Sequence, residues 1–415
     1  MLKKVILGAA ALAPLFAATV AEAAAPKVGT VFVISLENHN FTQSFTDPNL
    51  QQLKDNPAAP YLNSLITAGN PNAALTSFAS HYVNVPPQTA ASPSGAGAVH
   101  PSEPNYVWAE AGVAGPRNDA QPYPNNIVNA QNLSNVLQQN GETWRSYQEG
   151  IDLAKNAGGQ LTNTVVADNQ KIVPLTNFSG TSADYTNPYN GGHQYNYAAK
   201  HNPQLFFTAT NGGGDPTSAN PMAANYAPLE QLQSDLNANT VADYNWITPD
   251  QFNDMHTSLT GGFTYNGTHY AGDAAKIAQG DNFLSLIVPM IMASQAFQNN
   301  GAIVIWNDET EGEDEAPGVF STEIVISNLA KGNAYTNNIS YDHSSDLRTM
   351  QEIFGVDPAH GIGFLGGAAQ ATDLGDLFKS GALGAVPEPA SWALMILGFG
   401  GVGALMRRRG GLALG

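Results

Sequence analysis

VFVISLEN, residues 31–38, is a short apolar run that ends in a carboxylate and an amide, Glu37 and Asn38. An apolar run of this length, bounded by polar residues, is typical of a strand buried on both faces of a parallel sheet. α/β proteins build their sites at the carboxyl ends of such strands. The run therefore predicts an α/β fold with Glu37 and Asn38 at a functional edge.

A second run, AIVIWNDE at residues 302–309, repeats the pattern and ends in Asp308 and Glu309. If both strands lie in one parallel sheet, four oxygen-bearing side chains converge on one point, which is how proteins hold a hard divalent cation. Two plainer interpretations stay open. Asn38 is a good helix N-cap, and Asp308 opens an acidic run, residues 308–315, of the kind that usually forms a solvated loop.

The composition of the 415-residue chain excludes several classes of function. The net charge is −18 and basic residues cluster only at the two ends, which argues against nucleic acid as a partner. The chain has no cysteine, so disulfides, thiolate metal sites and a cysteine nucleophile are excluded. Any metal is therefore bound by oxygen and imidazole. The lack of cysteine also suits an exported bacterial protein.

The N-terminal end carries a targeting signal. Lys3 and Lys4 precede an apolar run, and the small-residue stretch 21–25 offers a cleavage site. Together these features predict a secretory signal peptide over residues 1–25.

The C-terminal end carries a second signal. Val386-Pro-Glu-Pro389 is followed by an apolar segment, 392–406, and by three arginines, 407–409. In that order, residues 387–415 resemble the PEP-CTERM sorting signal of Gram-negative bacteria. The resemblance implies that an exosortase-type enzyme removes the tail, that the short transmembrane segment anchors the chain only transiently, and that the protein is exported to the cell surface or beyond.

Between the signals, residues 26–380 are expected to form one domain, followed by a linker at 381–386. Short apolar runs alternate with helical stretches, which predicts a doubly wound, mostly parallel sheet. Two long polar stretches, 157–225 and 257–279, predict loop or cap insertions near the site. Candidate strands are Val31–Leu36, Thr143–Tyr147, Asp243–Ile247, Ala302–Trp306 and Glu323–Ile326; candidate helices are Tyr61–Ala68, Leu133–Gln139, Asn282–Phe297 behind an Asp281 cap, and Asp346–Phe354.

The motif HPSEPNY, residues 100–106, contains a candidate nucleophile, Ser102. Two prolines stiffen the backbone around this serine, as a pre-positioned nucleophile requires. A metal or a nearby base must lower the pKa of the hydroxyl. A G-x-S-x-G elbow is absent, so an α/β-hydrolase triad is not expected. The alternative is a proline-rich turn without a catalytic role.

Two histidines lie beside carboxylates in the sequence. His256 follows Asp254, and His343 follows Asp342. This arrangement is typical of an oriented general acid or a metal ligand. The other histidines, 39, 81, 193, 201, 269 and 360, lack comparable neighbours, although His39 and His100 adjoin candidate site residues.

Six motifs together resemble the bacterial phosphoesterase family, over about residues 28–378. The family includes acid phosphatases and phospholipases C, and it shares its core fold with alkaline phosphatases. The resemblance therefore implies an alkaline-phosphatase-like fold. The motifs are SLENHNF (35–41), HPSEPNY (100–106), WRSYQE (144–149), WITPDQFNDMH (246–256), WNDE (306–309) and DHSS (342–345).

The resemblance implies a role for each matching position. Ser102 corresponds to the nucleophile, which also contacts the metal, while His256 and His343 correspond to histidines that contact phosphate or protonate the leaving group. One divalent cation of unknown identity is expected. Its other ligands are Glu37, Asn38, Asp308 and Glu309, and the expected substrate-binding residues are His100, Asn105 and Asp254.

The sequence thus predicts a secreted or cell-surface phosphoesterase that hydrolyses phosphate esters through a phosphoserine. A phospholipase C-like phosphodiesterase is one alternative. Another is a non-catalytic, cation-binding matrix protein on the same fold. Glu103 favours the last, because the family usually has an apolar residue there and a carboxylate beside Ser102 could repel an anionic substrate.

Overall fold

A computed structural model describes residues 26–84, 99–313 and 316–384. The expected signal peptide at 1–25 and the sorting signal at 387–415, with its transmembrane segment, lie outside these residues. Within the described ranges, no helix combines the length and the apolar character that crossing a membrane requires.

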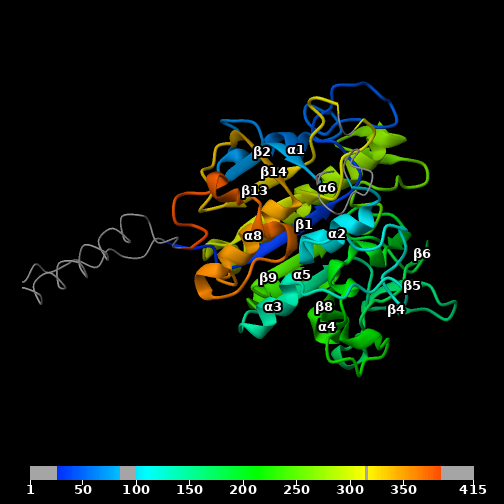
Figure 1. Cartoon of the computed structure of the whole chain (residues 1–415). Coiled ribbons are helices and arrows are strands. Elements are labelled where there is room, and N and C mark those ends of the chain that lie inside the picture. The colour runs from blue at the N-terminus through cyan, green and yellow to red at the C-terminus, as the bar shows by residue number, and fades with distance from the viewer. Residues whose placement is uncertain (1–25, 85–98, 314–315, 385–415) are drawn as a thin grey trace, which may run out of the picture.

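A mixed sheet of eight strands forms the centre of the molecule (Figure 1). These strands are β1 (Val31–Leu36), β2 (Thr76–Val83), β3 (Trp144–Gln148), β8 (Tyr226–Pro228), β9 (Tyr244–Thr248), β12 (Ala302–Asn307), β13 (Glu323–Ser327) and β14 (Tyr335–Asp342). Their order is β14-β2-β13-β12-β1-β9-β3-β8. Neighbours are parallel, except that β13 runs antiparallel to both β12 and β2.

Helices cover both faces of this sheet. On one face lie α1 (Pro60–Leu65), α5 (Leu232–Ala238), α6 (Asp273–Met292) and α7 (Gln295–Gln298). On the other lie α2 (Ser102–Ala111), α3 (Leu133–Gln139) and α8 (His343–Ile353), while the short α4 (Thr208–Asn211) belongs to an insertion. The expected doubly wound, mostly parallel α/β fold is therefore confirmed.

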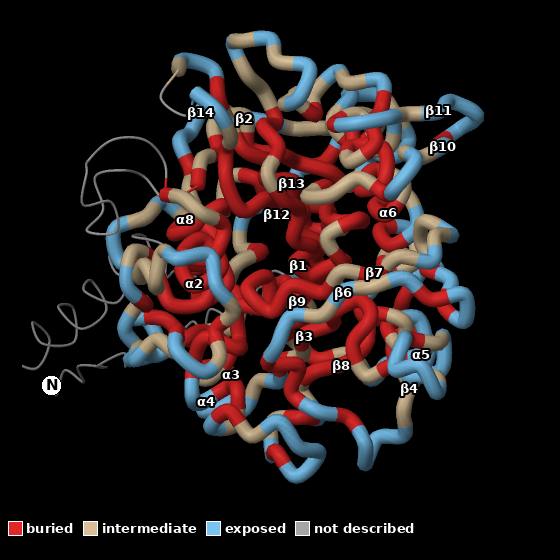
Figure 2. The backbone as a smooth tube through the Cα atoms, turned by 90° about the vertical axis from the view of Figure 1, so that its right-hand side faces the viewer, coloured by how far each residue is buried: buried red, intermediate tan, exposed pale blue. Residues whose placement is uncertain are grey.

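The core follows the two-residue period of the strands. Val33 and Val304 face the layer that holds α2 and α8, whereas Phe32 and Ile303 face the layer that holds α6. Every residue of β1 and β12 is buried, and the central strands are red along their length in Figure 2. Burial on both faces explains why these runs are apolar throughout rather than alternating.

Three strands of the sheet were not expected from the sequence: β2, β8 and β14. β14 is an edge strand, and most of its polar side chains are partly or fully exposed. Such a strand has no continuous apolar run to reveal it. β8 is only three residues long and ends in Pro228, which is tolerated because β8 is the opposite edge.

The long helix predicted to begin behind Asp281 instead begins at Asp273, so the cap assignment is wrong. Asp281 lies inside α6 and is fully buried. Its carboxylate accepts backbone N–H bonds from Tyr61 (2.9 Å) and Leu62 (2.7 Å) at the start of α1. Asp281 therefore caps a helix of another segment, a role that tertiary structure alone reveals.

The two polar stretches do contain insertions, but they are more ordered than loops. Residues 157–225 hold β5 (Leu161–Val165), which pairs with β4 (Leu153–Lys155), and the hairpin of β6 (Phe178–Thr181) and β7 (Gln194–Tyr197). They also hold a buried 3₁₀ turn, η3 (Ala199–His201). Residues 257–279 contain the hairpin of β10 (Phe263–Tyr265) and β11 (Thr268–Tyr270), followed by the first turns of α6.

Candidate functional site

The carboxyl ends of β1 and β12 lie side by side, because Leu36 pairs with Asn307 in parallel register. Glu37 and Asp308 therefore leave the sheet at the same point, and both are fully buried. Asn38 adopts a left-handed conformation, φ 51°, and its backbone N–H donates to Asp308 Oδ1 at 3.0 Å. It caps no helix, so the interpretation of residues 37 and 38 as a helix start is wrong.

Ser102 is the first residue of α2, and its side chain points into this edge. Ser102 Oγ lies 3.2 Å from Glu37 Oε2 and 3.2 Å from Glu309 Oε1. Asn38 Oδ1 lies 3.5 Å from the same atom. The site thus gathers oxygen atoms from two strand ends and one helix N-terminus, as the sequence predicted for Glu37, Asn38, Ser102, Asp308 and Glu309.

These oxygens have too few hydrogen-bond donors among them. Asp308 Oδ2 is buried with no partner. The amide oxygen of Asn38 faces acceptors, and only the opposite amide orientation would place its nitrogen 3.1 Å from Glu37 Oε2 and 3.2 Å from Glu309 Oε1. A buried group of oxygens without matching donors fits a bound cation. The residues present therefore suit the divalent metal that the sequence implied.

The pKa values support the same conclusion. Burial raises the pKa of Glu37 well above its usual value, and the neighbouring charges of Asp308 and Asp254 raise it further. Burial and then Asp308 raise the pKa of Glu309 to about 8. Burial also raises the pKa of Asp308. Crowded buried carboxylates hold protons unless a cation offsets their charge.

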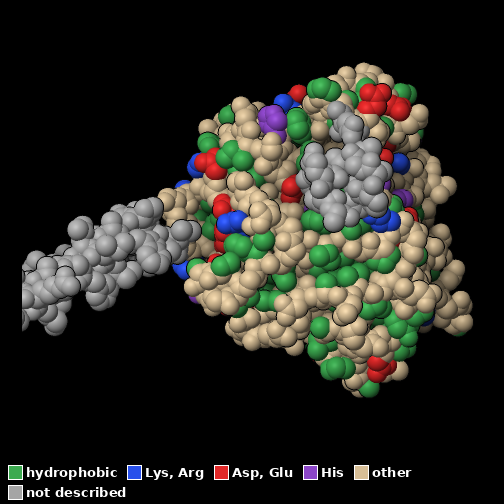
Figure 3. Space-filling view, viewed as in Figure 1, with side chains coloured by type: hydrophobic (Ala, Val, Ile, Leu, Met, Phe, Trp, Pro, Cys, Tyr) green, Lys and Arg blue, Asp and Glu red, His purple; other side chains and the backbone are tan. Residues whose placement is uncertain are grey.

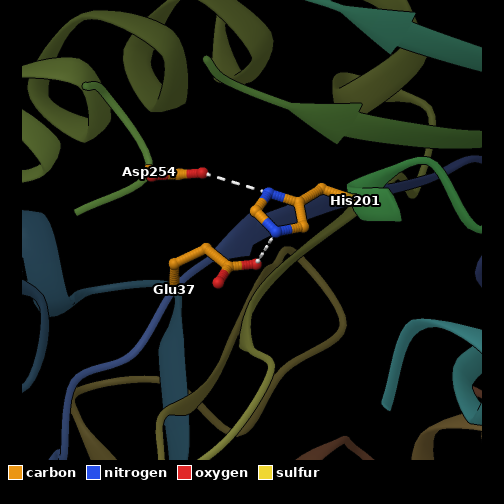
Figure 4. A group of neighbouring side chains, drawn as sticks. All are labelled: Glu37, His201 and Asp254. Atoms are coloured by element: carbon orange, nitrogen blue, oxygen red, sulfur yellow. Dashed lines mark ion pairs between the residues drawn. The ribbon is translucent and has the colours of Figure 1, made fainter. Parts of the chain in front are cut away.

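A histidine that the sequence analysis set aside, His201, lies in the middle of the site (Figure 4). Its Nε2 lies 3.3 Å from Glu37 Oε1, and its Nδ1 lies 3.5 Å from Asp254 Oδ2. All three side chains are buried, and their ligand atoms lie within 4.8 Å of one another. This triad could hold a metal ion.

His201 is held in place by α2. The ring of Tyr106 stacks on the imidazole with centroids 5.0 Å apart and an interplanar angle of 12°. The Tyr106 hydroxyl donates to Glu37 Oε1. Burial, and then the charges of Lys200 and His256, lower the pKa of His201 well below its usual value. The imidazole is therefore held neutral, as a metal ligand or hydrogen-bond partner must be. His201 has no neighbouring carboxylate in the sequence that would indicate a functional role. It lies in η3, which belongs to the polar insertion at residues 157–225.

His256 lies next to this triad. Its backbone N–H donates to Asp254 Oδ1 at 2.8 Å, and its ring centroid is 6.1 Å from that of His201. Its Nδ1 contacts the Thr257 hydroxyl at 2.9 Å. Burial, followed by the charge of Lys200, lowers its pKa to about 4. The structure thus brings His256 and Asp254 to the edge of the oxygen cluster.

His343 occupies a different position from the other predicted residues. Its Nε2 contacts the backbone carbonyl of Asp308 at 2.6 Å. Its Nδ1 contacts the Tyr82 hydroxyl at 2.6 Å and accepts from Trp306 Nε1 at 3.1 Å. Burial lowers its pKa to about 3. His343 therefore lies behind Asp308, with both ring nitrogens engaged, and touches the site through the backbone.

His100 and Asn105 both contact Glu309. His100 Nδ1 lies 2.6 Å from Glu309 Oε2, and Asn105 Nδ2 lies 3.4 Å from the same oxygen. Asn105 also donates to the Val99 carbonyl at 2.8 Å. These contacts orient the Glu309 carboxylate toward Ser102. His100, with 35% of its side chain exposed, is the most accessible of the three predicted substrate-binding residues, since Asn105 and Asp254 are buried.

Glu103 does not face the oxygen cluster. Its Oε2 accepts backbone N–H bonds from Asn118 at 3.0 Å and Asp119 at 2.9 Å. The carboxylate beside the candidate nucleophile therefore points to a neighbouring loop.

The fold is that of an α/β protein, and the buried Glu37, His201 and Asp254 could hold a metal ion beside a serine. The chain belongs to the phosphoesterase family, whose model matches residues 95–357. The resemblance that the six motifs carried is thus confirmed. A second model, the PEP-CTERM protein-sorting motif, matches residues 385–409. The motif is that of exported, surface-sorted proteins processed by an exosortase.

Three known proteins are similar to the chain at low sequence identity. A probable acid phosphatase from Kluyveromyces lactis is 23% identical over 256 residues, which span 61% of this chain and 48% of that protein. A crystal structure from Vibrio parahaemolyticus in the alkaline phosphatase superfamily is 11% identical, with TM-score 0.43, over 85% of this chain and 72% of that one. The crystal structure of the lipoteichoic acid synthase LtaP from Listeria monocytogenes is 9% identical, with TM-score 0.44, over 83% of this chain and 76% of that one.

Proposed function

We propose that the protein is a metal-dependent phosphoesterase, similar to acid phosphatases, that hydrolyses phosphate esters through a phosphoserine at Ser102. The observation that carries this proposal is the position of Ser102 Oγ, 3.2 Å from each of two carboxylates at the helix N-terminus. Glu37, Asn38, Ser102, Asp308 and Glu309 would hold the cation. When bound, the cation neutralises phosphate charge and lowers the pKa of the serine hydroxyl.

Each residue then has a step in the reaction. The Ser102 hydroxyl gives its proton to the carboxylate of Glu37 or Glu309, and its oxygen forms a bond to phosphorus in line with the ester oxygen. The bond from phosphorus to the ester oxygen breaks, and His256, whose low pKa in the free site the negative charge of a bound phosphate would raise, gives the leaving alcohol a proton. A water molecule then gives a proton to His256 and its oxygen bonds to phosphorus, the bond from phosphorus to Ser102 Oγ breaks, and Ser102 takes back its proton from the carboxylate, which releases phosphate and restores the starting state.

The remaining residues would position these groups. His201 lies within reach of both Glu37 and Asp254, so it either contacts the phosphate or serves as a further metal ligand. His100 and Asn105 hold Glu309. His343, with both ring nitrogens engaged, would act through the backbone of Asp308 rather than as a proton donor. We therefore propose a positioning role for His343 in place of the direct catalytic role that the resemblance implied.

The direction of Glu103 supports the enzyme over the matrix-protein alternative. Glu103 was the feature that favoured a non-catalytic protein, because a carboxylate could repel the substrate. Its charge is instead directed at two N–H groups of another loop. The choice between phosphomonoester and phospholipase C-like diester substrates rests on the assay described below.

We also propose a route for the whole chain. Residues 1–25 would direct export and be removed, residues 26–380 would form the enzyme, and 381–386 would link it to the signal at 387–415. An exosortase-type enzyme would then cut the tail of the transiently anchored chain, leaving the enzyme at the cell surface or outside a Gram-negative cell. On the face in Figure 3, described Lys and Arg side chains are scattered rather than gathered.

The first experiment is an assay of the purified protein against p-nitrophenyl phosphate and bis-p-nitrophenyl phosphate between pH 4 and 9. Each reaction is run with added divalent metals and with EDTA. We expect turnover that EDTA abolishes and metal restores, and the preferred compound separates a monoesterase from a diesterase. Absence of turnover with every metal would favour the non-catalytic, cation-binding alternative.

A further inference from the structure

The carboxylate that follows the nucleophile has a defined partner outside the catalytic cluster. Glu103 is fully buried on α2, and one of its oxygens accepts the consecutive N–H groups of Asn118 and Asp119. Asp119 also has a left-handed backbone, φ 58°. Glu103 thus fixes the conformation of a surface turn at residues 118–119.

That turn holds a lysine of the site. The Asp119 carboxylate forms an ion pair with the ammonium of Lys200. The Lys200 side chain is only 10% exposed, whereas that of Asp119 is 47% exposed. The ion pair therefore lies at the boundary between solvent and the interior, with the lysine on the inner side.

Lys200 is next in the chain to His201, which contacts Glu37. Its ammonium lies near enough to act electrostatically on both of these residues and on Asp254 and His256. It therefore contributes positive charge close to the carboxylate cluster, one residue before His201 in the chain. A lysine ammonium on a flexible stem needs a partner to keep one position, and Asp119 supplies it.

We propose that Glu103 is a positioning residue for substrate binding, which acts through the 118–119 turn and Asp119 to hold the Lys200 ammonium where it contacts the phosphate of the ester. This inference rests on the proposed function, because it needs a phosphate at the site. It assigns Lys200 as a phosphate-binding residue and gives a role to Glu103, where the family usually has an apolar residue.

Successive contacts link Glu103 to Lys200 through the 118–119 turn. Removing the Glu103 carboxylate leaves two N–H groups without their acceptor and releases the turn. Asp119, half-exposed, then has no fixed position, and Lys200 loses its partner. The phosphate would meet a mobile ammonium, so binding weakens while Ser102 and the oxygen cluster keep their geometry.

The test uses kinetic constants of the metal-loaded full chain and the inhibition constant of inorganic phosphate. Glu103→Leu should raise KM and the phosphate inhibition constant about tenfold, with a much smaller change in kcat. Glu103→Gln keeps an acceptor oxygen and should restore most of the affinity. Lys200→Met should weaken binding about 10- to 100-fold, and the double variant Glu103→Leu/Lys200→Met should be no worse than Lys200→Met alone.

The matched control is Glu110→Leu on the same helix. Glu110 is also a buried carboxylate, but it accepts from Asn132, Ser134 and Gln204 and has no link to the turn. It should lower stability without a selective rise in KM. If Glu110→Leu matches Glu103→Leu, or if the Glu103 and Lys200 effects simply add, the proposal is overturned.

A second measurement does not depend on turnover. Labelling of Lys200 by an amine-reactive reagent, followed by mass spectrometry, should rise severalfold in Glu103→Leu and in Asp119→Asn relative to the unchanged protein. Asp119→Asn changes a half-exposed side chain and avoids the folding risk of the buried position. Unchanged labelling would refute the link from Glu103 to Lys200. Increased labelling in a protein without any turnover would instead uphold that link and reject the proposed function.

Discussion

At the scale of single residues, burial separates functional acids from solvated ones. Asp308 and Glu309 begin an acidic run, yet they are 0% and 3% exposed, while Glu313 in the same run is exposed. The first two end a central strand and the last lies in the following loop. The sequence allowed this distinction, because the apolar strand AIVIW directly precedes the first acids. It gave no comparable signal for His201.

The first residue-scale prediction concerns the nucleophile. Ser102→Ala should lower kcat by roughly 10³-fold or more, because no other hydroxyl is bonded to both Glu37 and Glu309 in the described structure. Metal content, measured by elemental analysis, should fall far less than activity, since four other ligands remain. Turnover by this variant at the rate of the unchanged protein would show that Ser102 is not the nucleophile.

The second residue-scale prediction concerns the metal. Asp308→Asn should weaken metal affinity at least about tenfold and lower activity in parallel, because it removes charge from the centre of the cluster. Titration calorimetry with the divalent metal that supports turnover measures the affinity. Glu313→Gln, an exposed acid of the same run, is the control and should change neither quantity. Unaltered metal affinity in Asp308→Asn would show that the acid pair is not a ligand pair.

At the scale of elements, α2 organises most of the site. Ser102 contacts the oxygen cluster. Glu103 contacts the 118–119 turn, and Tyr106 stacks on His201. The helix is capped at its C-terminal end by Gly112, which has φ 63°. The backbone carbonyl of Gly112 accepts an N–H bond from the loop at residues 365–367. The position of the whole helix therefore depends on a close backbone approach at its end.

The element-scale prediction compares two glycines with left-handed backbones. Gly141→Ala should cost about 1 to 2 kcal/mol, because its φ is 91° and a Cβ would meet no atom within 4 Å. Gly112→Ala should cost about 1 to 3 kcal/mol more, because its Cβ would lie 2.7 Å from Gly367 N and Leu365 O. Urea unfolding measures both, and equal losses would contradict the close packing of this helix end.

At the scale of the whole molecule, many carboxylates of this acidic chain are buried. Burial and then Glu149 raise the pKa of Glu230 to about 8, and burial raises the pKa of Asp346 to about 7. In both cases the folded protein keeps a proton that the unfolded chain, with ordinary pKa values near 4, has already lost. The unfolded state is thus favoured as the pH rises through this window.

The free energy of unfolding of the whole molecule should therefore fall as the pH rises through this window. The metal-free protein should lose stability as the pH rises from about 6.5 to about 8, above the range in which the lowered pKa values of His201, His256 and His343 oppose the trend, seen as a fall in Tm of several degrees. Glu230→Gln, which cannot ionise, should show a shallower fall. A Tm that stays constant or rises over this range in the metal-free protein would contradict the raised pKa values.

The sequence by itself determined the fold class and the oxygen-bearing side chains that follow two of its parallel strands. It could do so because each of these features is local: an apolar run buried on both faces is contiguous, and the polar residues follow it directly. Tertiary structure alone decided that His201 joins Glu37 and Asp254, that Asp281 caps α1, and that Glu103 faces the 118–119 turn. Each of these depends on contacts between segments far apart in the chain, whose direction no local pattern records.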